Sequence, residues 1–131
     1  RGKLYILFGC GGNRDKDKRI IMGKIAARFS DGAFITDDNP RDESPKEIRK
    51  QILAGFLPQK KAMVKEIEKR QKAIKIAISQ LDGNDALIIA GKGHENYQII
   101  GARKQKFDDM KVTKQEIKRI EKKHKIKKSL G

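Results

Sequence analysis

Short apolar runs alternate with stretches of helical periodicity along most of the chain, and this alternation limits the possible folds more than any other feature. Residues 3–8, 33–36 and 86–90 are apolar or rich in β-forming side chains, and between them apolar residues recur three to four positions apart. Such an order builds a parallel sheet, because each helix returns the chain across the sheet in a right-handed crossover. We therefore expect an α/β domain, with a mostly parallel sheet flanked by helices.

Three amphipathic helices are indicated between these runs. The second one starts at Ser44, because serine can cap a helix, Pro45 suits its first turn and Glu47 can complete a capping box. The apolar stripes that we expect to pack on the sheet are Ile21, Met22, Ile25, Ala26 and Phe29 in the first helix, Ile48, Ile52, Leu53 and Phe56 in the second, and Ala73, Ile74, Ala77, Ile78 and Leu81 in the third.

The other segments give signals of unequal clarity. Residues 86–90 are apolar at every position, which predicts a central strand of the sheet. Residues 63–67 fit either a short strand or an early turn of the third helix, and the pattern leaves both open. Residues 98–100 and 103–107 indicate a hairpin, and a last helix is marked by Val112, Ile117 and Ile120.

The chain is strongly basic, with 32 Lys and Arg against 17 Asp and Glu and a net charge of +15. From Lys111 to the end, nine Lys and Arg stand against two Glu, a local excess of seven. A non-enzymatic nucleic-acid-binding module is one hypothesis, but the basic run lacks interleaved aromatic residues on which bases could stack. We favour a solvated helix and a frayed basic tail at residues 120–131, after a domain at residues 1–119.

Several classes of protein are excluded by composition. No apolar run is long enough to span a membrane or to serve as a secretory signal. Cys10 is the only cysteine, and with His94 and His124 it gives no zinc-ligand spacing. We therefore expect a cytoplasmic protein with no membrane partner and no metal site in this domain. The chain opens with Arg1 and enters an apolar stretch at once, which predicts a piece of a longer protein.

Three loops rich in Gly, Asp, Asn and Arg directly follow predicted strands, at residues 9–17, 37–43 and 91–97. The carboxyl ends of parallel strands share one edge of a sheet, where the ligands of such folds bind. We therefore expect the three loops to gather at that edge and to carry the chemistry of the protein.

The first loop allows two interpretations. Its glycines could bring backbone amides to a phosphate at the start of the following helix, or they could merely permit a tight turn with solvated charges. Arg14 stands where a dinucleotide-binding fingerprint needs its third glycine, and the Gly-Lys-Ser/Thr of a P-loop occurs nowhere in the chain. The spacing leaves both interpretations open.

The second and third loops hold groups suited to a small zwitterion. Pro40 fixes the backbone between Asn39 and Arg41, which could direct a carboxamide and a planar guanidinium at a carboxylate. Spacing alone favours the alternative, an Asx-turn ahead of the capped helix. In the third loop Glu95 could bind an ammonium group, and we interpret His94 as a hydrogen-bonded loop residue.

Four strings stand in order along the chain: Gly-Cys-Gly-Gly-Asn-Arg-Asp-Lys at 9–16, Met-Gly-Lys-Ile-Ala at 22–26, Asp-Asp-Asn-Pro-Arg at 37–41 and Ala-Gly-Lys-Gly-His-Glu-Asn-Tyr-Gln at 90–98. Together they resemble the C-terminal domain of the Mur ligase family. The resemblance covers residues 3–109 and includes Phe-Asp-Asp at 107–109. It implies a Rossmann-like domain, and it favours a short strand near residues 63–67 before a helix that begins around Arg70.

The resemblance also implies a binding site for the amino acid substrate, meso-diaminopimelate. Arg14 and Arg41 suit the carboxylates of this substrate. Asn39, Glu95 and the Gly91 carbonyl suit its ammonium group. An ATP contact at Asn13 is implied less directly, because the family usually has an acidic residue there. The implied substrate-binding residues are Arg14, Asp38, Asn39, Pro40, Arg41, Gly91 and Glu95.

The implied activity of the whole protein is an ATP-dependent ligation in the bacterial cytoplasm. ATP phosphorylates the D-glutamyl γ-carboxylate of UDP-N-acetylmuramoyl-L-alanyl-D-glutamate, and an amine of meso-diaminopimelate then displaces phosphate. In the family, the P-loop and the Mg²⁺ ligands belong to a central domain, so we expect this domain to need the N-terminal and central domains as partners. A related ligase for another diamino acid, such as lanthionine, is an alternative. Nucleic acid is not an expected partner.

Overall fold

The computed structural model of the chain describes residues 2–13, 16–91, 97–100, 103–106 and 108–130. The expected alternation of strands and helices is confirmed, including the short strand before the third helix and the hairpin. The elements are β1 (Leu4–Phe8), α1 (Asp17–Phe29), β2 (Gly32–Ile35), α2 (Pro45–Leu53), the 3-10 helix η1 (Pro58–Met63), β3 (Val64–Glu66), α3 (Arg70–Ser79), β4 (Ala86–Ile89), β5 (Tyr97–Ile100), β6 (Arg103–Lys106) and α4 (Asp109–Leu130).

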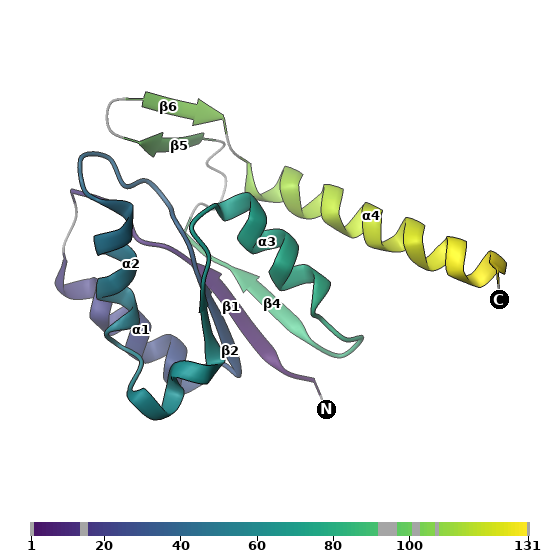
Figure 1. Cartoon of the computed structure of the whole chain (residues 1–131), viewed down its shortest axis with the longest axis horizontal. Helices are drawn as coiled ribbons and strands as arrows, with labels where there is room; N and C mark the ends of the chain where they lie inside the picture. Colours follow the sequence, from purple (N-terminus) through teal and green to yellow (C-terminus); the bar gives the residue numbers. More distant parts are fainter. Residues whose placement is uncertain (1, 14–15, 92–96, 101–102, 107, 131) are drawn as a thin grey trace.

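A parallel sheet in the order β3-β2-β1-β4 forms the centre of the fold, and β5 and β6 pair antiparallel in a separate hairpin. Helices α1 and α2 lie on one side of the sheet, and α3 and α4 on the other (Figure 1). The chain moves one way from β1 to β3 and then returns to β4, so right-handed crossovers place the helices on opposite faces. The Rossmann-like expectation is therefore confirmed.

Two apolar clusters hold the layers together, one on each face. Neighbouring residues of a strand point to opposite faces, so Leu7 and Phe34 join one cluster while Phe8 and Ile35 join the other. On the α1–α2 face the buried partners are Ala26, Ala27, Ile48, Ile52 and Phe56, and on the α3 face they are Ala73, Ile74, Ala77 and Ile78.

The predicted stripe of α1 is wrong in all but one residue. Ala26 is buried, but Ile21, Met22, Ile25 and Phe29 are exposed. Apart from Arg19, the buried face carries small residues, because α1 lies very close to α2: a Cβ on Gly23 would be 2.1 Å from the carbonyl oxygen of Ile52. Large side chains cannot enter so narrow a space, and the helix turns them to the outside.

The prediction that residues 86–90 form a central strand is also wrong. Strand β4 pairs with β1 and is an edge strand of the four-stranded sheet. Leu87 and Ile89 pack against the α3 cluster, whereas Ile88 points to the other face and is 49% exposed. An apolar run indicates that both faces of a strand are apolar, but it does not fix the order of the strands.

Helix α4 runs without a break from Asp109 to Leu130, so the basic segment after residue 120 continues the helix. Val112 and Ile120 pack against the α3 cluster, while Ile117 is exposed. Across the described ranges, none of the helices combines the length and the apolarity that a membrane crossing requires.

We expect Ile52→Ala to lower the free energy of unfolding by about 2–5 kcal/mol, because Ile52 is fully buried and its truncation leaves a cavity. Ile25→Ala removes the same atoms from a side chain that is 52% exposed, so a loss of about 1 kcal/mol or less is expected. Urea unfolding followed by circular dichroism measures both values. Equal losses would mean that α1 buries its large apolar residues.

Candidate functional site

The first and second loops meet at the carboxyl edge of the sheet, as the sequence predicted. The parallel ladder extends past the strands, where Thr36 N donates to Phe8 O at 3.0 Å. Beyond that bond, Gly12 N donates to Asn39 O at 2.6 Å. No side chain fits at Gly12, since its Cβ would lie 1.7 Å from Pro40 O. The two loops therefore touch through their backbones.

The third loop begins against the other two. Gly91 has a φ of +110°, a conformation that favours glycine. A Cβ at this position would lie 3.7 Å from both Asp38 Oδ2 and Gly9 O. The structure thus brings Asp38 of the second loop and Gly9 of the first loop close to Gly91, as the sequence led us to expect. The predicted site residues Arg14 and Glu95 lie outside the described residues.

Arg41 has an unusual backbone for a long side chain, with a φ of +51°. Left-handed backbone costs about 1–2 kcal/mol in a residue with a Cβ, so the surrounding structure must hold it in place. Its Nη1 donates to Gly12 O at 3.1 Å and to Asn39 O at 3.2 Å. Within the described part of the chain, both side-chain hydrogen bonds of Arg41 come from this one nitrogen.

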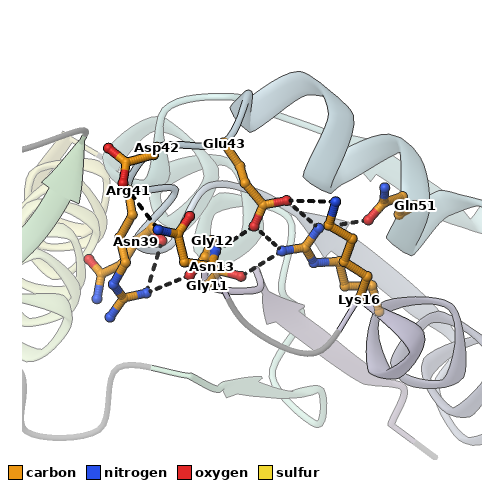
Figure 2. A network of polar contacts seen from close by, with 10 residues as sticks. Gly11, Gly12, Asn13, Lys16, Asn39, Arg41, Asp42, Glu43 and Gln51 are labelled. Atoms are coloured by element: carbon orange, nitrogen blue, oxygen red, sulfur yellow. Dashed lines mark hydrogen bonds and ion pairs between the residues drawn. The ribbon is translucent and has the colours of Figure 1, made fainter.

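Asn13 directs the first loop toward the second. Its backbone N–H donates to the Glu43 carboxylate at 2.5 Å, and its side-chain amide donates to Asp42 at 3.1 Å. Figure 2 shows Gly12 and Asn13 between Arg41 and Glu43. Two successive amides are thus occupied, and the nearby Glu43 carboxylate would repel a phosphate. This geometry favours the tight-turn interpretation of the first loop over a phosphate cradle.

A buried guanidinium fixes Glu43. Arg19 is 1% exposed, and its two terminal nitrogens donate to both Glu43 oxygens, at 3.1 and 2.7 Å. The same nitrogens donate to Gln51 at 2.7 Å and to Gly11 O at 2.9 Å. The hydrogen bonds from Arg19, helped by the Asn13 N–H, lower the pKa of Glu43 to about 2. As a carboxylate, Glu43 therefore joins the two loops to α1, and Arg19 extends the network to Gln51 of α2.

Two other titratable groups belong to the loops themselves. Burial raises the pKa of Asp37, against the effect of its hydrogen bond from Arg49, which also donates to Glu66 at 2.8 Å. Burial raises the pKa of Cys10 to about 11, so its thiol is protonated at neutral pH. Because the thiolate is the nucleophilic form, Cys10 does not suit nucleophilic catalysis.

Sequence reasoning missed the buried arginines of this site. Arg19 and Arg70 resemble the solvated charges of any surface helix, and both are 1% exposed. A signal was present in α1, where Arg19 shares a helical face with the small residues Gly23, Ala26 and Ala27. A charged residue in line with small, buried ones indicates a side chain that reaches an internal partner.

The low pKa of Glu43 predicts a pH-dependent stability. Folding lowers this pKa from about 4.5 to about 2, so the ion pair contributes fully above pH 4.5 and loses its contribution as the pH falls toward 2. We expect Glu43→Gln to destabilise the chain at neutral pH, by an amount that shrinks between pH 4.5 and 2. Urea unfolding at several pH values measures this difference.

Glu121→Gln makes the same change on the exposed surface of α4 and is the matched control. The free energy of unfolding of this variant, relative to that of the unaltered chain, should not show the pH dependence expected for Glu43→Gln. A pH-independent effect of Glu43→Gln would contradict the assignment of an ionised Glu43 held by Arg19.

The chain is similar to known proteins of one family. Residues 1–93 match the family model described as "Mur ligase, glutamate ligase domain". Two curated relatives bear the name UDP-N-acetylmuramoyl-L-alanyl-D-glutamate–2,6-diaminopimelate ligase. That of Rickettsia typhi is 57% identical over 113 residues, which are 86% of this chain and 22% of the relative. That of Rickettsia rickettsii is 55% identical over 116 residues, which are 88% of this chain and 24% of the relative.

A solved structure of a protein with the same name superposes with a TM-score of 0.85 at 36% sequence identity. The match covers 92% of this chain and 25% of the other. The chain thus spans about a quarter or less of the length of the proteins that it matches. Since the family model covers most of the chain and the fold agrees with it, the chain belongs to the Mur ligase family, as its glutamate ligase domain.

Proposed function

We propose that this domain holds the amino acid substrate of an ATP-dependent ligase of peptidoglycan precursor synthesis. The reaction adds meso-diaminopimelate to UDP-N-acetylmuramoyl-L-alanyl-D-glutamate and releases ADP and phosphate. One observation carries the proposal: residues 38–41 are held against Gly12 and Gly91 at the edge where α/β sheets bind ligands. The names of relatives that are 53–57% identical to the chain support the choice of substrate.

Arg41 is the group that we assign to a carboxylate of the substrate. A guanidinium binds a carboxylate with two parallel hydrogen bonds. Nη1 of Arg41 is used on the carbonyls of Gly12 and Asn39, which fixes the plane of the guanidinium. The edge formed by Nη2 and Nε is then the one to meet a carboxylate. Arg14 is proposed for a second carboxylate.

The ammonium group beside the carboxylate that we assign to Arg41 needs hydrogen-bond acceptors. The Asp38 carboxylate lies beside Gly91, and Asn39 is buried next to it along the chain. Carboxylate, carbonyl and carboxamide oxygens all accept hydrogen bonds from an ammonium group. We therefore assign this group to Asp38, Asn39, Gly91 and Glu95. Lysine lacks the carboxylate at this end and would leave an arginine without its partner, so the same site would select against lysine.

We infer that ATP and Mg²⁺ are bound mainly outside this domain. Among the described residues, no three His, Cys, Asp or Glu side chains are grouped to hold a metal ion. The whole sequence also lacks the Gly-Lys-Ser/Thr of a P-loop. We infer that the N-terminal and central domains bind ATP, Mg²⁺ and the nucleotide-linked dipeptide in the bacterial cytoplasm. We also propose a nucleotide contact at Asn13, whose side-chain amide donates to Asp42 in this structure.

Substitution of Arg41 tests the carboxylate assignment in the full-length ligase. We expect Arg41→Lys to lower kcat/KM for meso-diaminopimelate roughly tenfold or more, because lysine keeps the charge and loses the paired hydrogen bonds. Arg41→Ala should raise the barrier by about 2–5 kcal/mol. Steady-state kinetics with meso-diaminopimelate, lanthionine and lysine give the ratios of kcat/KM, and the preference over lysine should shrink in Arg41→Ala.

The KM for ATP should stay within about twofold in both variants, and Arg28→Lys, an exposed arginine of α1, should match the unaltered enzyme. An unchanged preference over lysine together with weakened ATP binding would make Arg41 a nucleotide residue. Such a result would contradict the assignment of the second loop to the amino acid.

The absence of a P-loop predicts that the 131-residue chain alone neither hydrolyses ATP nor forms an amide bond. The full-length ligase should do both when meso-diaminopimelate and the nucleotide-linked dipeptide are supplied. A phosphate-release assay with the purified chain and with the full-length ligase compares them directly. ATP turnover by the chain alone would overturn this division of the chemistry.

A further inference from the structure

Arg70 and Asp109 form a buried ion pair between α3 and α4. Arg70 is the first residue of α3 and Asp109 the first of α4, and both side chains are almost entirely buried. Nε and Nη2 of the arginine donate to the two carboxylate oxygens, each at 2.7 Å. The pair is therefore bidentate, the geometry in which an arginine and a carboxylate bind most strongly.

The remaining donors of Arg70 reach the two loops that hold the proposed substrate. Nη2 donates to Ala90 O at 3.1 Å, and Nη1 donates to Asp37 O at 3.4 Å. Asp37 directly precedes residues 38–41, and Ala90 directly precedes Gly91. One rigid guanidinium thus holds the backbone where both loops begin, while Asp109 fixes the guanidinium itself.

Stability alone does not account for such an arrangement. A buried ion pair gains little over a well-packed apolar pair of similar volume, because both charges must lose their water. What an apolar pair cannot do is hold two backbone carbonyls at a fixed spacing. The guanidinium does this with its planar set of donors. What Arg70 provides beyond stability is therefore a fixed relative position of these two backbone segments.

We propose that Arg70 and Asp109 are positioning residues that set the distance between residues 38–41 and Gly91, and hence the fit of the amino acid substrate. This inference rests on the proposed function. It also gives α4 a role, because the first residue of α4 orients the arginine. A charged pair that touches no substrate then controls the KM for the amino acid.

Three variants of the full-length ligase test the proposal. Arg70→Lys loses the paired geometry, and Asp109→Asn loses the charge that orients the arginine. The double variant Arg70→Met with Asp109→Leu replaces the ion pair by apolar side chains, so it should regain the stability lost in the single variants. We expect the KM for meso-diaminopimelate to rise at least tenfold in all three, with the KM for ATP within about twofold.

The double variant separates positioning from a structural role. If the pair only stabilises the fold, the KM for meso-diaminopimelate should recover together with the melting temperature, and this recovery would overturn the proposal. A raised KM at a restored melting temperature supports it. Arg119→Lys is the matched control, because Arg119 pairs with Glu116 on the same helix and its side-chain bonds go only to that glutamate within the described residues. It should leave both KM values unchanged.

Hydrogen exchange of the 131-residue chain gives a readout that needs no substrate. Arg70→Lys should speed amide exchange at least tenfold in peptides that cover residues 38–41 and Gly91, with little change in α1. Unchanged exchange in these peptides would overturn the positioning role. If the unaltered ligase does not use meso-diaminopimelate, the proposed function is wrong, and the exchange experiment still decides whether Arg70 sets the two loops.

Discussion

Buried guanidinium groups hold the loops at the carboxyl edge of the sheet. Where parallel strands end, backbone carbonyls leave the ladder and need other donors. Arg19 donates to Gly11 O, and Arg70 donates to Asp37 O and Ala90 O. Each guanidinium offers five donors in one plane, so a single side chain can satisfy a carbonyl and a carboxylate together. The shape of the loops depends on this capacity.

The acidic partners of these arginines stabilise their buried charges. Glu43 balances Arg19, and Asp109 balances Arg70, so each buried cation has a carboxylate within hydrogen-bonding distance. Loss of one partner would leave a charge without compensation in a dry environment, which is far more costly than loss of the whole pair. The described parts of these loops are thus held in place without a ligand, and preorganisation of this kind lowers the entropy cost that binding must overcome.

Much of this architecture could be predicted from the sequence, because periodicity and turn chemistry are local. The capped start of α2 at Ser44 and the meeting of the loops both follow from such signals. The exposed face of α1 could not be predicted in this way, since it depends on how closely two helices approach. The edge position of β4 depends on strand order, and the internal role of Arg70 depends on partners far along the chain.

The exposed apolar side chains of α1 make the self-association of the chain depend on the salt concentration. Ile21, Ile25 and Phe29 follow one another at intervals of four on the exposed surface, a strip that favours association between copies. The net charge of +15 opposes such contacts. Salt weakens only the repulsion, because the Debye length falls from about 10 Å at 0.1 M to about 3 Å at 1 M. Rising ionic strength therefore drives molecules of this chain together.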